Sequence, residues 1–91
     1  MQETGIMKKI TIYSKMLCPY CAGAKDLLVE KGQQFEEIDI GKTPDQRAIM
    51  ISRAAGRQTV PQIFIGDHHV GGCDDLYALE RTGRLDSLLA E

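Results

Sequence analysis

The sequence has no tryptophan, few aromatic residues and no long apolar run. No apolar stretch approaches the roughly 20 residues that a membrane-spanning helix needs, and residues 1–7 lack the apolar segment of a secretory signal peptide. The chain also lacks a basic excess, since 11 Lys and Arg residues stand against 13 Asp and Glu residues. This balance leaves no electrostatic footprint for nucleic acid or for an anionic membrane. We therefore expect a cytoplasmic protein that binds neither.

Cysteine is scarce as well, with three residues in the chain. Without a secretion signal, such sparse cysteines fit a reducing compartment, where a pair spaced Cys-x-x-Cys is usually catalytic. The length of 91 residues suits one domain with a single core. Residues 1–6 precede a second methionine and lie outside the first periodic segment, so we predict a flexible tail there and one domain over residues 7–91.

The feature that is present and carries chemistry is the pair Cys18 and Cys21, placed where an alternating apolar run ends and a helical pattern begins. If Cys18 is the N-cap, Pro19 takes the first helical position, where its missing N–H costs nothing. The Cys18 sulfur then faces unpaired N–H groups and the positive end of the helix dipole, which lower a thiol pKa from ~8.5 to roughly 3.5 to 7.5. Cys21 lies one turn further on and points inward. The pattern predicts thiol–disulfide exchange, with Cys18 as nucleophile and Cys21 as resolving thiol.

Two other interpretations of the pair are weaker. A structural zinc site needs four ligands, and the other candidates are Cys73, His68 and His69, without a second Cys-x-x-Cys. The two histidines flank a tight turn, and we expect both to be solvated, with no metal. A purely structural disulfide is disfavoured because so short a loop removes little chain entropy from the unfolded state.

Apolar periodicity along the chain alternates between two-residue and helical repeats. The strand before the dithiol, the first helix and the next strand make a β-α-β unit with parallel strands. Gly66-Asp67 is a two-residue hairpin signal, which makes the second half antiparallel. We therefore predict an α/β fold in the order β-α-β-α-β-β-α, with helices on both faces of a small mixed sheet of four strands. The predicted strands are residues 8–13, 35–40, 62–65 and 68–70, and the predicted helices are residues 19–31, 43–56, 74–83 and 84–90.

The second predicted helix starts with a recognisable signal. Thr43-Pro44-Asp45-Gln46 is typical of a capping box, with proline at the first helical position. Helical spacing then predicts an inner face made of Ala48, Ile51, Ser52 and Ala55.

Three motifs identify a family when they are taken together. Their order and separation along the chain match those of the glutaredoxins, and from Met7 onward the chain resembles the short bacterial class with two active-site cysteines. The resemblance implies a thioredoxin-like fold and a monomeric, glutathione-dependent oxidoreductase. Its partners would be glutathione and proteins that carry disulfides or are glutathionylated. The motifs are Cys18-Pro19-Tyr20-Cys21, Thr59-Val60-Pro61 and Gly71-Gly72-Cys73-Asp74-Asp75.

The resemblance also implies how glutathione is held along its middle. In similar proteins the peptide bond between Val60 and Pro61, after Thr59, is cis and lies beside the active-site disulfide. The backbone N–H and C=O of Val60 can then pair with an extended thiol peptide, as one more strand would. Without the resemblance, an ordinary trans proline that opens a strand is the default reading.

A second part of the implied site is the segment before the last long helix. Gly72 lets the backbone approach a ligand closely, and the helix N-terminus supplies N–H groups for an anion. The resemblance implies that Cys73 and Asp74 receive the γ-glutamyl end of glutathione, with its amino group on Asp74 and a possible share for Asp75. Either aspartate would also serve as a plain helix cap.

Two more residues are candidates around the dithiol. A cation at Lys15 favours the Cys18 thiolate, and the resemblance implies that it meets the glycine carboxylate of glutathione. Tyr20 is expected to pack against the bound tripeptide. The alternatives are a solvated loop lysine and simple surface cover. Arg53 and Arg57 either add positive potential or belong to a solvated helix face.

The sequence allows alternatives for Cys73, for a bound cluster and for the source of electrons. Cys73 is either a semi-buried packing residue or a third reactive thiol. Some relatives carry a [2Fe-2S] cluster between two subunits, although Pro19 argues against it because those relatives usually have glycine or serine there. A thioredoxin-like electron carrier, fed by a flavoprotein reductase, would have no need of Asp74 or Lys15.

Overall fold

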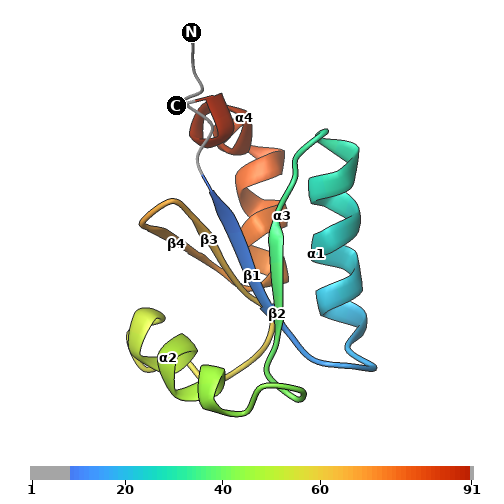
Figure 1. Cartoon of the computed structure of the whole chain (residues 1–91). Coiled ribbons are helices and arrows are strands. Elements are labelled where there is room, and N and C mark those ends of the chain that lie inside the picture. Colours follow the sequence, from blue (N-terminus) through green and yellow to red (C-terminus); the bar gives the residue numbers. More distant parts are fainter. Residues whose placement is uncertain (1–8, 91) are drawn as a thin grey trace, which may run out of the picture.

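The computed structural model describes residues 9–90, so the predicted tail over residues 1–6 lies outside the described part. One mixed sheet with the strand order β2-β1-β3-β4 forms the centre of the molecule (Figure 1). β1 pairs with β2 in parallel, and the β1–β3 and β3–β4 pairs are antiparallel, as predicted. The strands are β1 (Ile10–Ser14), β2 (Glu36–Asp39), β3 (Gln62–Ile65) and β4 (His68–Gly71).

Helices cover both faces of this sheet, as predicted. Figure 1 shows α1 and α3 together on one side, with α4 at their end, and α2 on the other side. None of the helices in residues 9–90 combines the length and apolarity that crossing a membrane requires. The helices are α1 (Pro19–Glu30), α2 (Asp45–Arg53), α3 (Cys73–Arg81) and α4 (Arg84–Ala90).

The two-residue repeat of the central strands divides the buried side chains into two clusters. Ile12 in β1 and Ile63 in β3 point into a cluster shared with α1, α3 and α4. Tyr13 and Phe64, one position further along each strand, point into the other cluster under α2. Because successive strand residues face opposite sides, the sequence pattern fixes which helix each strand residue meets.

The hairpin signal between the last two strands is confirmed. Gly66 has a φ of 59°, while Asp67 does not have a positive φ. A positive φ at the first turn position alone is the geometry of the hairpin turn with glycine first. The turn therefore aligns β4 antiparallel beside β3.

The predicted start of α2 is wrong, and three of the four residues of its predicted inner face are wrong. The Thr43 hydroxyl donates to the backbone carbonyl of Asp39 at 2.8 Å, no side chain of residues 9–90 caps the helix, and α2 begins after Pro44. Met50 and Ala54 are fully buried instead, and burying the large Met50 side chain removes more apolar surface from water than burying alanine or serine would. Of the predicted inner face, Ile51 packs against the cluster, whereas Ala48, Ser52 and Ala55 are exposed.

A polar network ties α1 to the end of the sheet where the dithiol lies. Glu37 in β2 accepts a hydrogen bond from the Ser14 hydroxyl at 2.6 Å and forms an ion pair with Lys25 of α1 at 2.8 Å. The hydrogen bond from Lys25, followed by that from Ser14, lowers the pKa of Glu37 below its ordinary value of 4.5. The folded protein therefore favours the ionised form of Glu37.

This lowered pKa predicts an acid-sensitive contribution to stability. The contribution is complete above the unfolded pKa of Glu37 and is lost as the pH falls through the lower folded pKa. We expect Glu37→Gln to reduce the drop in melting temperature between about pH 5 and about pH 3, because an amide does not titrate. Thermal unfolding followed by circular dichroism at several pH values measures this, and parallel curves for both proteins would contradict it.

Candidate active site

Cys18 and Cys21 occupy the start of α1 in the predicted geometry. Cys18 is the N-cap, Pro19 is the first helical residue, and the backbone N–H of Cys21 donates to Cys18 Sγ at 3.2 Å. The two sulfurs form a disulfide, with Cα atoms 5.2 Å apart. Cys21 is buried, while Cys18 is partly exposed. Only the first sulfur is thus open to a substrate, and it is the one that a helix N-terminus stabilises as a thiolate.

The segment before β3 lies directly beside this sulfur. Cys18 Sγ is 4.0 Å from the carbonyl oxygen of Val60, and the peptide bond between Val60 and Pro61 is cis, as the resemblance implied. Tertiary contact therefore brings together two motifs that are about forty residues apart in the sequence.

A groove of about 260 Å³ extends from Val60 to the start of α3. It gathers most of the predicted binding residues in one place. Arg57 also lines it, which favours the first of the two alternatives for this residue. In the sequence, only the position of Arg57 just before the Thr-Val-Pro segment indicated that it would lie at the site. The lining residues are Tyr20, Arg57, Thr59, Val60, Pro61, Gly72, Cys73, Asp74 and Asp75.

The two aspartates at the start of α3 have different surroundings. Asp75 accepts a hydrogen bond from the backbone N–H of Gly72 at 2.9 Å and pairs with Arg57 at 3.2 Å. These contacts, the Gly72 bond first, lower the pKa of the Asp75 carboxyl. Asp74 is exposed at the mouth of the groove. Asp75 is therefore committed to the helix cap, whereas Asp74 is left exposed at the groove.

Gly71 is required just before this cap. Its φ is 113°, a conformation that other residues rarely adopt. A Cβ at this position would collide with the Asp75 carboxylate and with the Arg57 guanidinium. Glycine here thus allows the cap, and with it the floor of the groove, to form.

Cys73 behaves as a packing residue. Its side chain is partly buried against the cluster shared by α1 and α3, and a Cβ at Gly23 of α1 would lie 3.6 Å from its sulfur. Burial, with a smaller effect of the Asp74 charge, raises the pKa of the Cys73 thiol. A raised pKa favours the unreactive thiol form of Cys73.

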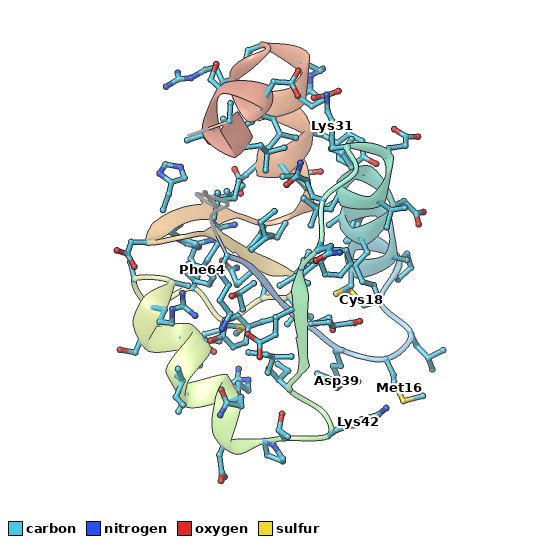
Figure 2. The ribbon with its side chains drawn as sticks, turned by 45° about the horizontal axis from the view of Figure 1, so that its top comes forward. Met16, Cys18, Lys31, Asp39, Lys42 and Phe64 are labelled. Atoms are coloured by element: carbon cyan, nitrogen blue, oxygen red, sulfur yellow. A yellow bond between two sulfur atoms is a disulfide. The ribbon has the colours of Figure 1, made fainter. Side chains whose placement is uncertain are left out.

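Lys15 lies away from the other predicted binding residues, on a second groove of about 490 Å³ at the other side of the dithiol. This groove is bounded by the loop before Cys18, the first turns of α1 and the edge of β2. Figure 2 shows Met16 and Asp39 on this side of Cys18, with the Met16 side chain pointing outward. Lys15 therefore lines the same groove as Cys18 but does not line the groove that ends at Asp74.

A mixed sheet with a Cys-x-x-Cys at a helix N-terminus, facing a cis proline, defines a dithiol oxidoreductase of the thioredoxin-like fold. The comparisons specify the family. The family model described as glutaredoxin matches residues 10–70. A glutaredoxin of Pseudomonas aeruginosa is 55% identical over 84 residues, which are 92% of this chain and 99% of the relative. The chain belongs to the glutaredoxin family, the glutathione-dependent thiol–disulfide oxidoreductases.

Solved structures agree with this assignment. The solution structure of glutaredoxin from Brucella melitensis superposes with a TM-score of 0.80 at 61% identity, covering 93% of this chain and 91% of that one. A complex of buckwheat glutaredoxin with glutathione superposes with a TM-score of 0.81 at 34% identity, covering 89% and 76%. The fold is therefore shared with a relative that binds glutathione.

The position of Cys18 predicts a reactive thiolate. In the reduced protein, we expect the alkylation rate of Cys18 to rise through a midpoint well below the free-thiol value of ~8.5, because the α1 N-terminus stabilises the anion. Rapid alkylation with iodoacetamide across a pH series, with mass-spectrometric assignment of the labelled cysteine, measures the midpoint. Cys73 is the internal control and should label slowly over the same range, since its pKa is raised. A Cys18 midpoint at or above that of Cys73 would contradict the activation.

Proposed function

We propose that this chain reduces protein disulfides and protein–glutathione mixed disulfides, with glutathione as the reductant. The observation that carries the proposal is the sulfur of the partly exposed Cys18 at the α1 N-terminus, 4.0 Å from the Val60 carbonyl at one end of a groove. That geometry supports attack by a thiolate on a disulfide held along Val60.

The proposed reaction is a series of thiol–disulfide exchanges that balances at each step. The Cys18 thiolate attacks one sulfur of the substrate disulfide, and the other sulfur leaves as a thiolate that takes up a proton. With a protein disulfide, Cys21 then gives up its proton and attacks Cys18, which releases the reduced protein and leaves the Cys18–Cys21 disulfide. Two glutathione molecules reduce this disulfide and end as oxidised glutathione.

The groove supports a specific placement of glutathione. Its cysteine would pair with the Val60 backbone, and its γ-glutamyl carboxylate would meet N–H groups at the α3 N-terminus. Asp74 would hold the γ-glutamyl amino group, and Tyr20, which is 65% exposed, would cover the tripeptide. For the glycine carboxylate, Arg57 at the groove and Lys15 beside Cys18 both offer a cation.

We propose that the chain works as a monomer in the cytoplasm. One chain supplies both cysteines, the Val60 backbone and the α3 N-terminus, so the described site needs no second copy. A disulfide reductase also needs a reducing compartment to return to its dithiol form.

The decisive experiment uses one glutathionylated peptide and two reducing systems. We expect the protein to reduce it with glutathione, glutathione reductase and NADPH, and to be inactive with thioredoxin reductase and NADPH alone. Activity only with thioredoxin reductase would indicate an electron carrier of the thioredoxin type. A brown, dimeric protein on purification would instead indicate a cluster carrier.

A further inference from the structure

A buried amide lies behind the binding segment and belongs to none of the assigned roles. Gln62, the first residue of β3, is fully buried. Its side-chain Nε2 donates to the backbone carbonyl of Thr59 at 3.0 Å and approaches the Thr59 hydroxyl oxygen at 3.3 Å. The side chain therefore folds back over Val60 and Pro61 and ties the two ends of this short segment together.

His69 completes the arrangement from the neighbouring strand. Its Nε2 lies 2.7 Å from Gln62 Oε1. The Thr59 carbonyl can only accept, so it fixes the amide nitrogen of Gln62 on its own side, and the amide oxygen must face the histidine. His69 Nε2 is therefore the donor, which corrects the expectation that this histidine is solvated.

Aromatic packing holds the His69 ring in place. The ring stacks on Phe64, with centroids 4.8 Å apart and an interplanar angle of 23°. The Arg53 guanidinium carbon lies 4.2 Å from the Phe64 ring centroid, and its Nη1 donates to the Tyr13 hydroxyl at 2.9 Å. Figure 2 labels Phe64, which lies between the sheet and α2. The ring orientation is thus set by aromatic packing that is independent of the substrate groove.

The surroundings of His69 favour its neutral form. Burial, followed by Arg57, lowers the pKa of His69, with smaller opposing and supporting effects from Asp75, His68 and Arg53. A neutral imidazole carries one N–H, and the contact with Gln62 requires it on Nε2. We call the hydrogen-bonded chain from His69 through Gln62 to Thr59 the relay. Among residues 9–90, every buried side-chain nitrogen or oxygen has a hydrogen-bond partner, so the relay leaves no buried polar atom unsatisfied.

We propose that His69, acting through Gln62, is a positioning residue for the substrate-binding segment Thr59–Pro61. The inference rests on the proposed function, since Val60 in this segment is the backbone that meets the thiol peptide. Loss of the His69 donor leaves Gln62 Oε1 buried without a partner. The Gln62 amide then turns so that its oxygen accepts a hydrogen bond from another donor, and its own hydrogen bond to Thr59 is lost. Substrate binding weakens, while the reactivity of Cys18 is set elsewhere, at the α1 N-terminus.

The test replaces the ring without removing the stack. We expect His69→Phe to raise KM for a glutathionylated peptide about fivefold to tenfold, the size that one lost hydrogen bond supports. The expected change in kcat is less than about twofold, because the interaction is not made to the reacting sulfur. His69→Gln, which returns an N–H near the Nε2 position, should recover most of the loss. His68→Phe on the exposed neighbour is the matched control and should leave KM unchanged.

Two results would overturn the proposal. One is an unchanged KM in His69→Phe, whatever happens to its melting temperature, because that shows a purely structural contact. The other comes from the unaltered protein, so it depends neither on variant folding nor on substrate identity. The ¹⁵N shifts of the imidazole report which nitrogen is protonated, and a neutral His69 with its proton on Nδ1 would reverse the relay. Failure of the wild-type protein to reduce the peptide would instead refute the proposed function. The ¹⁵N shifts of His69 would then still show whether Nε2 donates to Gln62.

Discussion

Cys18→Ser is expected to abolish the reduction of every disulfide substrate, whereas Cys21→Ser should keep the reduction of glutathionylated peptide and lose that of protein disulfides. The asymmetry follows from position. Cys18 is the partly exposed N-cap of α1, and Cys21 is buried one turn later. A serine hydroxyl is not ionised near neutral pH, so the first variant has no nucleophile. The second retains it, and a glutathione adduct on Cys18 can be released by another glutathione.

The measurement compares both variants on one glutathionylated peptide and one protein disulfide. Each variant is the control for the other, because both exchange one sulfur for one oxygen within the same helical turn. With a protein disulfide, Cys21→Ser should accumulate a covalent adduct through Cys18 that mass spectrometry detects. Equal loss of both activities in the two variants would contradict the assigned roles.

Asp74→Ala is expected to have the second-largest effect. Loss of a charge-assisted hydrogen bond costs about 1.5 to 3 kcal/mol, so KM for glutathionylated peptide should rise roughly tenfold to a hundredfold. The alkylation midpoint of Cys18 should stay unchanged, because Asp74 lies at the start of a different helix. Steady-state kinetics and the alkylation series together measure this split.

The neighbouring carboxylate provides a contrast. Asp75 caps Gly72 and pairs with Arg57, so Asp75→Ala should lower stability by about 1 kcal/mol, the usual cost of a lost cap. Asp67→Ala, in the β3–β4 turn, makes the same charge change away from the groove and is the control for net charge. If Asp74→Ala lowers the melting temperature and leaves KM unchanged, Asp74 is a cap and the γ-glutamyl position is assigned wrongly.

Most of the fold could be predicted because its signals act over a few residues. The two-residue repeat of β1 and β3 predicted the strands, and Gly66 predicted the hairpin by its freedom to adopt a positive φ. Helix α2 was the exception. Its repeat allows two inner faces, and the choice of Met50 depends on the space between Tyr13 and Phe64, residues that are distant in the sequence.

The candidate site divides in the same way. The sequence by itself determined the N-cap position of Cys18, since a cysteine followed by proline at a helix start needs no other part of the chain. Tertiary structure decided that Asp75 also pairs with Arg57, because the two residues are 18 positions apart in the sequence. It also decided that His69 reaches Gln62, since that contact exists only when β4 lies beside β3. Neighbouring residues determine local backbone preferences. The pairing of polar side chains depends instead on which segments the folded sheet brings within hydrogen-bond distance.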